Sequence, residues 1–141
     1  MGPQDHRFTE ESVQTFLGEE AVVSSALGRS AIRLKSPQLE FKPLAADAMM
    51  GGTDPSNVVD DIFPMGSIQC PSGSPILVGY EGPPGRGYPK IAVTISAELW
   101  EVGQLRPHDR IRFVSVTLEE AGAAASELQD WASNSSIVYG A

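Results

Sequence analysis

The sequence predicts a mainly β protein: a closed or nearly closed β-barrel with a helix near each end. Its 141 residues include 14 glycines and 11 prolines, and these turn formers separate short apolar runs. About six or seven segments have the length and composition of strands, and only two long ones have helical periodicity. A hydrophobic fraction of 41% is sufficient for one domain with its own core.

The composition also excludes some classes of partner. A formal net charge of −8 argues against nucleic acid and anionic membranes, because both bind basic surfaces. Cys70 is the only cysteine, so no disulfide can form within the chain. There is no signal-peptide pattern and no apolar span long enough for a bilayer, so we expect a cytoplasmic protein.

The first helix is expected over residues 9–17. Thr9 is a good N-cap, and Glu10 and Glu11 place acids in the first turn, where the helix dipole favours them. Phe8 and Val13 stand at the positions of a hydrophobic staple. These local signals predict where the helix begins.

The last helix is expected over residues 118–132. Thr117 and Glu120 have the spacing of a capping box. One face carries mostly small apolar residues, which predicts close packing on a sheet; its members are Ala121, Ala124, Ala125, Leu128 and Trp131. We therefore place one domain at residues 1–132 and a flexible tail at residues 133–141.

The strands are expected as short segments between these helices. Strand-like runs occur at residues 21–23, 31–34, 67–70, 76–78, 91–95 and 111–113, with an irregular one near 39–41. Residues 71–74 form a hairpin turn, and residues 45–55 form a loop without regular structure. Ser96 caps a short helical turn at residues 97–102, on which Trp100 packs against the barrel.

A first group of polar residues, Asn57, Asp60 and Asp61, lies within five positions. Carboxylates accept hydrogen bonds from N–H groups, and an amide both donates and accepts, so this group suits a urea, amide or lactam. The alternative is an Asx-rich turn whose side chains satisfy backbone N–H groups.

A second group, Arg86, Tyr88 and Lys90, lies in a glycine-rich loop over residues 79–90. The glycines let the backbone approach a ligand, and the two cations can contact a carboxylate or phosphate. The loop lacks the G-K-[ST] ending of an ATP-binding P-loop. In the functional interpretation Lys90 lies at the rim of the site and adds little to stability. The alternative is a solvent-exposed loop with an ordinary cation.

The remaining candidates are weaker. Gln69 stands in a strand, where an inward polar side chain is costly unless it is used. His6 and His108 are expected on the surface, and Cys70 is expected to be a buried, inert thiol. No His, Cys and Asp spacing indicates a metal site.

Several blocks of the sequence resemble one family. They are GYPKIA at 87–92, ISAEL at 95–99, QLRP at 104–107 with Asp109, PSNV at 55–58 with Asp60, and GPQD at 2–5 with FTEE at 8–11. Together they resemble allophanate hydrolase subunit 2, a family that includes a 5-oxoprolinase subunit and the carboxyltransferase domain of urea carboxylase. The resemblance covers residues 2–116 and only the second half of family members.

The resemblance implies a cyclophilin-like barrel that acts on a small amide, urea or lactam. It implies roles for Asn57, Asp60 and Lys90, and Arg29 keeps a family position. Val59 stands where the family usually has a histidine, and Phe63 where it has an aromatic hydroxyl. Carboxybiotin and ATP are the groups that the family implies, although no residue pattern assigns a cofactor to this chain. Because the resemblance covers only the second half of family members, it implies a partner that supplies the first half, or a homodimer.

Three classes of function follow. The first is an enzyme domain or subunit of this family, the second a free-standing barrel adapted to another small-molecule reaction, and the third a non-catalytic binding or regulatory module. For the first, we expect the catalytic and substrate-binding side chains to converge at one barrel mouth. The expected catalytic residues are Asp60, Lys90 and Asn57, and the expected substrate-binding residues are Asp61, Gln69, Arg86, Tyr88 and Arg29.

Overall fold

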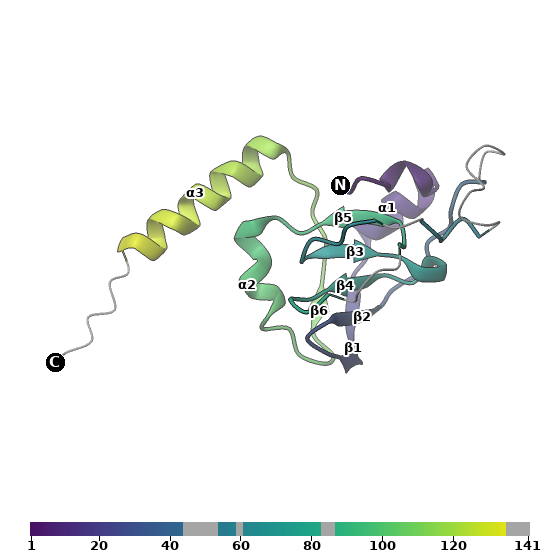
Figure 1. Cartoon of the computed structure of the whole chain (residues 1–141), viewed down its shortest axis with the longest axis horizontal. Coiled ribbons are helices and arrows are strands. Elements are labelled where there is room, and N and C mark those ends of the chain that lie inside the picture. The colour runs from purple at the N-terminus through teal and green to yellow at the C-terminus, as the bar shows by residue number, and fades with distance from the viewer. Residues whose placement is uncertain (44–53, 59–60, 83–86, 135–141) are drawn as a thin grey trace.

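The computed structural model describes residues 1–43, 54–58, 61–82 and 87–134, and it confirms the mainly β architecture (Figure 1). Within these ranges, three α-helices and three short 3-10 helices accompany six strands. In chain order the elements are η1 (Asp5–Arg7), α1 (Glu10–Gly18), β1 (Ala21–Leu27), β2 (Ala31–Lys35), β3 (Ser67–Gln69), η3 (Pro71–Gly73), β4 (Ile76–Val78), β5 (Lys90–Val93), η4 (Ser96–Glu98), α2 (Leu99–Val102), β6 (Arg110–Ile111) and α3 (Leu118–Asn134).

The six strands form one antiparallel sheet in the order β5-β3-β4-β2-β1-β6. The expected hairpin between β3 and β4 is confirmed, with Ile68 opposite Leu77. Among the described residues, the two edge strands β5 and β6 do not pair with each other. The structure therefore shows an open sheet, where the sequence predicted a closed or nearly closed barrel, and β6 has only two residues with which to pair.

Helix α1 begins where its capping signals predicted. The side chain of Thr9 accepts a hydrogen bond from the backbone N–H of Ser12 at 3.2 Å. Phe16 then faces the core and stacks on Phe113, with ring centroids 4.6 Å apart. Phe16 of α1 thus belongs to the same hydrophobic core as Ile68 of β3 and Leu77 of β4.

The N-terminal segment covers the outer edge of β5. The backbone N–H groups of Gly2 and Gln4 donate to the carbonyls of Ile91 and Lys90, at 2.8 and 3.2 Å. A Cβ atom at Gly2 would lie 2.5 Å from the Lys90 carbonyl oxygen, so this close approach requires glycine. The segment is anchored by Phe8, which is fully buried.

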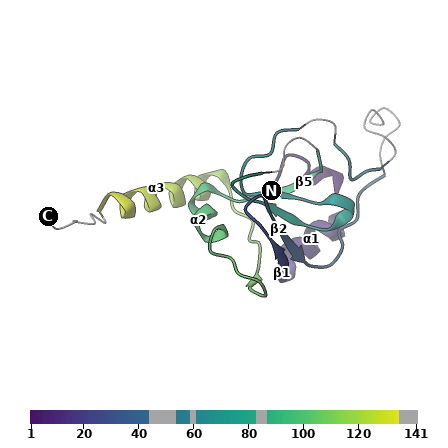
Figure 2. The ribbon, with the colours of Figure 1, turned by 60° about the horizontal axis from the view of Figure 1, so that its bottom comes forward.

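The capping box of α3 is confirmed, but the expected packing of this helix is wrong. The N–H of Glu120 donates to the Thr117 hydroxyl at 3.1 Å, and the N–H of Thr117 donates to the Glu120 carboxylate at 2.7 Å. The helix extends away from the sheet and buries none of its residues (Figures 1 and 2). Trp131 is 67% exposed. The capping signals fix where the helix starts, whereas its small side chains offer little apolar area for docking.

Trp100 is also not packed on the sheet, contrary to expectation, because 56% of its surface is exposed.

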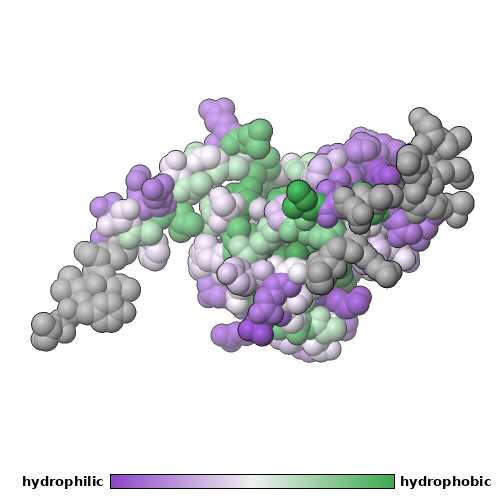
Figure 3. Space-filling model, viewed as in Figure 1, coloured by the Kyte–Doolittle hydropathy of each residue, from purple (hydrophilic) through white to green (hydrophobic). Residues whose placement is uncertain are grey.

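A groove of about 620 Å³ lies between β5 and β6, and it extends to the first turn of α3. Its lining includes Ala92, Val93, Ile111 and Leu118. Figure 3 shows apolar surface that continues from the start of α3 onto the body of the molecule.

The expected loop at residues 45–55 lies outside the described residues except at its end, as does the expected tail from residue 135 onward. Within the described part of the chain, no helix combines the length and the hydropathy that crossing a bilayer requires.

Candidate functional site

The two polar segments singled out in the sequence meet at the start of β5. Val58 and Gly87 form an isolated β-bridge, in which the Val58 N–H donates to the Gly87 carbonyl at 2.8 Å. A Cβ atom at Gly87 would lie 2.1 Å from the Val58 carbonyl oxygen, so the bridge depends on glycine at this position. The bridge brings the segment that carries Asn57 and Asp61 beside the segment that carries Tyr88 and Lys90.

Lys90 and Asp61 form an ion pair at the centre of this meeting point. The Lys90 Nζ donates to Asp61 Oδ2 at 2.5 Å. The Lys90 side chain is 2% exposed and that of Asp61 is 29% exposed. The Lys90 ammonium also lies over the Phe63 ring, 5.3 Å from its centroid. The expectation that Lys90 is a rim lysine is therefore wrong, because the segment that carries Asp61 and Phe63 covers it.

Gln4 is part of this cluster, although no sequence pattern assigned it a role. Its Oε1 accepts from the Lys90 backbone N–H at 3.1 Å, and its Nε2 donates to Asp61 Oδ2 at 2.8 Å. Gln4 thus fixes Asp61 and the start of β5 relative to each other. It lies 86 positions from Lys90, so no local pattern could indicate the contact; the only signal was its place in the GPQD block.

Gln69 lies next to Lys90 across the sheet. The two residues are partners in the β3–β5 pairing, next to an irregularity in which the register shifts between Ile68 and Gln69. The Gln69 side chain is 1% exposed. Its Nε2 is buried and has no hydrogen-bond partner among the residues that the structure describes. The sequence expectation of an inward polar residue on β3 is met.

The other predicted residues are placed less centrally. Asn57 is exposed, and its backbone carbonyl accepts from Arg7 at 2.8 Å. Tyr88 is half-buried in the loop that leads to β5. Arg29 is 83% exposed and pairs with Glu81 at 3.2 Å, and no described contact joins it to Lys90. Asp60 and Arg86 lie outside the described residues, as does Val59, so their roles remain predictions.

The remaining titratable candidates have the surroundings that the sequence indicated. His6 and His108 are exposed. Cys70 is fully buried, and this burial raises the pKa of its thiol far above the ordinary value, so the thiolate that a nucleophile requires is not populated. Within the described part of the chain, no group of His, Cys, Asp and Glu has the arrangement of a metal site.

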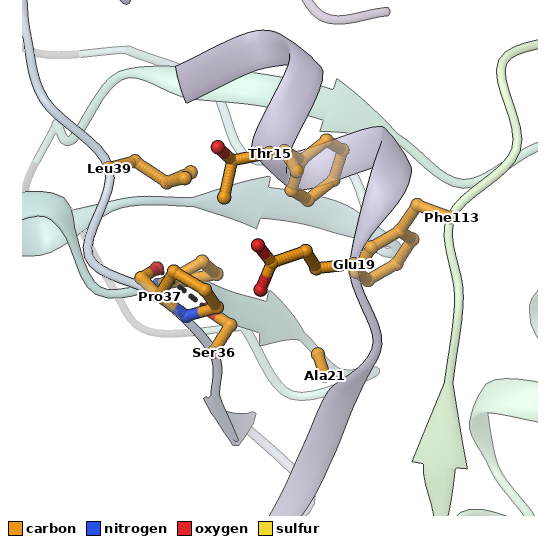
Figure 4. Close-up of a pocket in the computed structure, with 9 residues that line it drawn as sticks. Thr15, Glu19, Ala21, Ser36, Pro37, Leu39 and Phe113 are labelled. Carbon is orange, nitrogen blue, oxygen red and sulfur yellow. Dashed lines mark hydrogen bonds between the residues drawn. The ribbon is translucent and has the colours of Figure 1, made fainter. Parts of the chain in front are cut away.

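The small pocket in Figure 4 lies between α1 and the sheet and does not belong to this cluster. Thr15, Glu19, Ser36 and Phe113 are among its lining residues. Its volume is about 10 Å³, which leaves room for about one water molecule. We therefore assign it to imperfect packing between α1 and the sheet rather than to ligand binding.

The ion pair predicts a loss of stability in acid. The hydrogen bond from Lys90 lowers the pKa of the Asp61 carboxyl below its ordinary value, although partial burial opposes this effect. A carboxyl whose pKa is lower in the folded state stabilises the protein above its unfolded pKa of about 3.9, and this contribution is lost as pH falls through the folded pKa. Urea unfolding at several pH values should show this loss below about pH 4.

The variant Lys90→Met should lose less stability over the same pH range, because it removes the cause of the shift at Asp61. Lys35→Met is the matched control, since Lys35 is exposed on β2 and should leave the pH dependence unchanged. Identical pH profiles for the wild type and Lys90→Met would contradict this role of the pair.

Comparisons with known proteins show the family to which the chain belongs. The family model described as "Carboxyltransferase domain, subdomain A and B" matches residues 1–115. Urea amidolyase from Lachancea kluyveri is 34% identical over 114 residues, which are 81% of this chain and 6% of that protein. A 5-oxoprolinase subunit of Escherichia coli is 30% identical over 129 residues, which are 91% of this chain and 38% of that protein.

A crystal structure of urea carboxylase from Kluyveromyces lactis has a similar fold. The match covers 94% of this chain and 12% of that one, with a TM-score of 0.83 and 29% identity. The chain thus spans a small part of the relatives it matches, between 6% and 38% of the two named above. The family resemblance drawn from the sequence blocks is confirmed: the chain belongs to the family of carboxyltransferase domains, subdomains A and B.

Proposed function

We propose that this chain is the part of a small-molecule enzyme that binds a small amide, urea or lactam beside the Lys90–Asp61 pair. The observation that carries the proposal is the convergence of two distant loops on a buried ammonium and a carboxylate. An ammonium donates to a carbonyl oxygen and a carboxylate accepts from an N–H group, so the pair offers both partners of an amide. Two of the relatives, urea amidolyase and a 5-oxoprolinase subunit, are named after urea and a lactam, which are compounds of this chemical class.

Within this proposal, Lys90 and Asp61 bind and orient the substrate, and Asp60 and Asn57 remain the further catalytic candidates. Carboxybiotin would supply the carboxyl group when bound, and its uncharged ureido carbonyl oxygen is the acceptor that the Lys90 ammonium suits. Asp61 and Gln4 hold the Lys90 end of β5 in one position, so the chain contributes a rigid donor and acceptor set.

We further propose that a separate partner covers the groove between β5 and β6 and the exposed face of α3. The chain corresponds to a fraction of its relatives, so they contain further protein beyond the region equivalent to this chain. A second copy is less suitable, because Glu98 and Glu101 outnumber the one basic residue among the described residues of the groove, Arg112, and every charged residue of α3 is acidic. Two copies would bring acid against acid, whereas a partner with lysine or arginine beside an apolar patch would be complementary.

Light scattering tests this assembly. The isolated chain should be a monomer, and adding the remaining portion of a carboxyltransferase domain on a second polypeptide should give a one-to-one complex. Trp131→Glu and Leu128→Glu should weaken the complex without changing the fold, because α3 buries none of its residues in this chain. A stable homodimer that the same substitutions dissociate would instead identify a second copy as the partner.

Ligand binding tests the proposed function itself. In an amide NMR spectrum, millimolar acetamide, the neutral lactam 2-pyrrolidinone and urea should each shift signals of residues 61–63 and 87–90. An alcohol of similar size, 2-propanol, is the control, since it lacks the planar carbonyl and N–H pair. Shifts confined to the groove between β5 and β6, or no shifts from any of the three ligands, would refute the proposed site.

A further inference from the structure

We infer that the side-chain amide nitrogen of Gln69 and the ammonium of Lys90 together bind the carbonyl oxygen of a neutral ligand. This inference rests on the proposed function and deepens it, because it assigns the atoms that hold the carbonyl. The site lies beside residues 61–64, from which Asp61 and Phe63 contact Lys90.

The placement of the two side chains comes from the sheet register. Gln69 is paired with Lys90 on β5 and with Ile76 on β4, so it sits in the interior of the sheet and not at an edge. The β3–β5 register shifts between Ile68 and Gln69, and next to this irregularity Gln69 and Lys90 are opposite each other, with both side chains buried, at 1% and 2% exposure. Residues 61–64 lie close to them, because the Ser67 hydroxyl donates to the Pro64 carbonyl at 2.7 Å and Phe63 lies over Lys90.

The site has more hydrogen-bond donors than acceptors. Gln69 Nε2 is buried and unpartnered in the described part of the chain. The Lys90 ammonium has several N–H donors, and Asp61 Oδ2 is its acceptor among the described residues. A buried donor without an acceptor is costly, and native proteins rarely leave one unused. An oxygen atom placed between the two nitrogens would satisfy both.

The charge at the site favours a neutral ligand over an anion. The positive charge of Lys90 is already balanced by the Asp61 carboxylate at 2.5 Å. A carboxylate ligand would bring a second negative charge next to Asp61 in a poorly solvated place, which is unfavourable. A neutral carbonyl avoids this repulsion, and an N–H group on the same ligand can donate to Asp61, whose side chain is 29% exposed.

The decisive variant is Gln69→Met, which keeps the length of the side chain and removes the amide. Because Nε2 makes no hydrogen bond within the described chain, this substitution should leave the melting temperature unchanged or raise it. It should weaken acetamide binding by about five- to tenfold, which is the factor in affinity that one neutral hydrogen bond usually contributes. Gln14→Met, at an exposed position on α1, should change neither quantity.

A spectroscopic readout identifies the contact without relying on a variant. The side-chain NH₂ signals of Gln69, assigned by their absence in Gln69→Met, should shift downfield when acetamide is added to the wild-type protein. Acetate at the same concentration should bind more weakly than acetamide.

The outcomes separate this inference from the proposed function. If acetamide binds the wild type and Gln69→Met equally, the role of Gln69 is refuted while the proposed function stands. If acetate binds more tightly than acetamide, the assignment of a neutral ligand is refuted. If Gln69→Met lowers the melting temperature by several degrees, Gln69 is structural and the inference fails. If none of the neutral ligands binds the wild type, both the inference and the proposed function fail.

Discussion

Replacing Asp61 by alanine should lower the free energy of unfolding by about 3 kcal/mol, because it leaves a buried ammonium without its carboxylate. Lys90 is 2% exposed in the folded protein, so its charge is compensated by Asp61 rather than by water. The reverse change, Lys90→Met, should cost less, since the Asp61 side chain is 29% exposed and keeps its hydrogen bond from Gln4. Chemical denaturation of both variants at neutral pH measures this difference.

The double variant provides the internal control. With Lys90→Met added to Asp61→Ala, no unpaired charge remains buried, so the double variant should be more stable than Asp61→Ala alone. Asp61→Asn should fall between the wild type and Asp61→Ala, because its amide oxygen can still accept from Lys90. A double variant whose loss equals the sum of the two single losses would show that the residues do not interact.

Replacing Phe8 by alanine should cost about 3 to 5 kcal/mol, as is usual for a large, fully buried aromatic side chain. Phe8 is 0% exposed, its ring lies 4.7 Å from that of Phe41, and the two residues form a β-bridge. The N-terminal segment is held there, so the loss should also release Gly2 and Gln4 from the edge of β5. Hydrogen exchange of the Gly2 and Gln4 amides should therefore become faster by a larger factor than the loss of global stability alone would produce.

Phe8→Leu is the graded control, since it keeps most of the buried apolar area and should lose clearly less stability. If Phe8→Ala loses under about 1 kcal/mol, the N-terminal segment is not anchored in the way described.

Local signals were sufficient for the starts of α1 and α3 and for most strands, whereas Ser96, expected to cap the short helical turn, lies inside η4 and makes no capping hydrogen bond. The N-cap at Thr9 and the capping box at Thr117 involve residues three positions apart, and both formed as the sequence indicated. The alternation and β-branched content of the strands likewise depend on neighbouring residues. What a helix packs against depends on the rest of the molecule, which is why the apolar stripe of α3 led to a wrong expectation.

The candidate site was predicted only in part, for the same physical reason. The two polar segments do meet, but Asp61, expected only as a substrate-binding residue, is the carboxylate that pairs with Lys90. Lysine side chains are exposed in most proteins. Lys90 is buried because segments distant in the sequence cover it, and a local pattern does not show such segments. Gln4 was missed because its contact crosses most of the chain, whereas Gln69 was found because a glutamine inside a strand is unusual in itself.

The central claim is that two distant loops meet on a buried ion pair between Lys90 and Asp61. A lysine-selective ¹⁵N spectrum tests it most directly, since the chain has only three lysines, Lys35, Lys42 and Lys90. We predict one ammonium signal that is protected from exchange at neutral pH, is absent in Lys90→Met and shifts strongly in Asp61→Asn. A spectrum with no protected ammonium, or with one that is unchanged in Asp61→Asn, would contradict the claim.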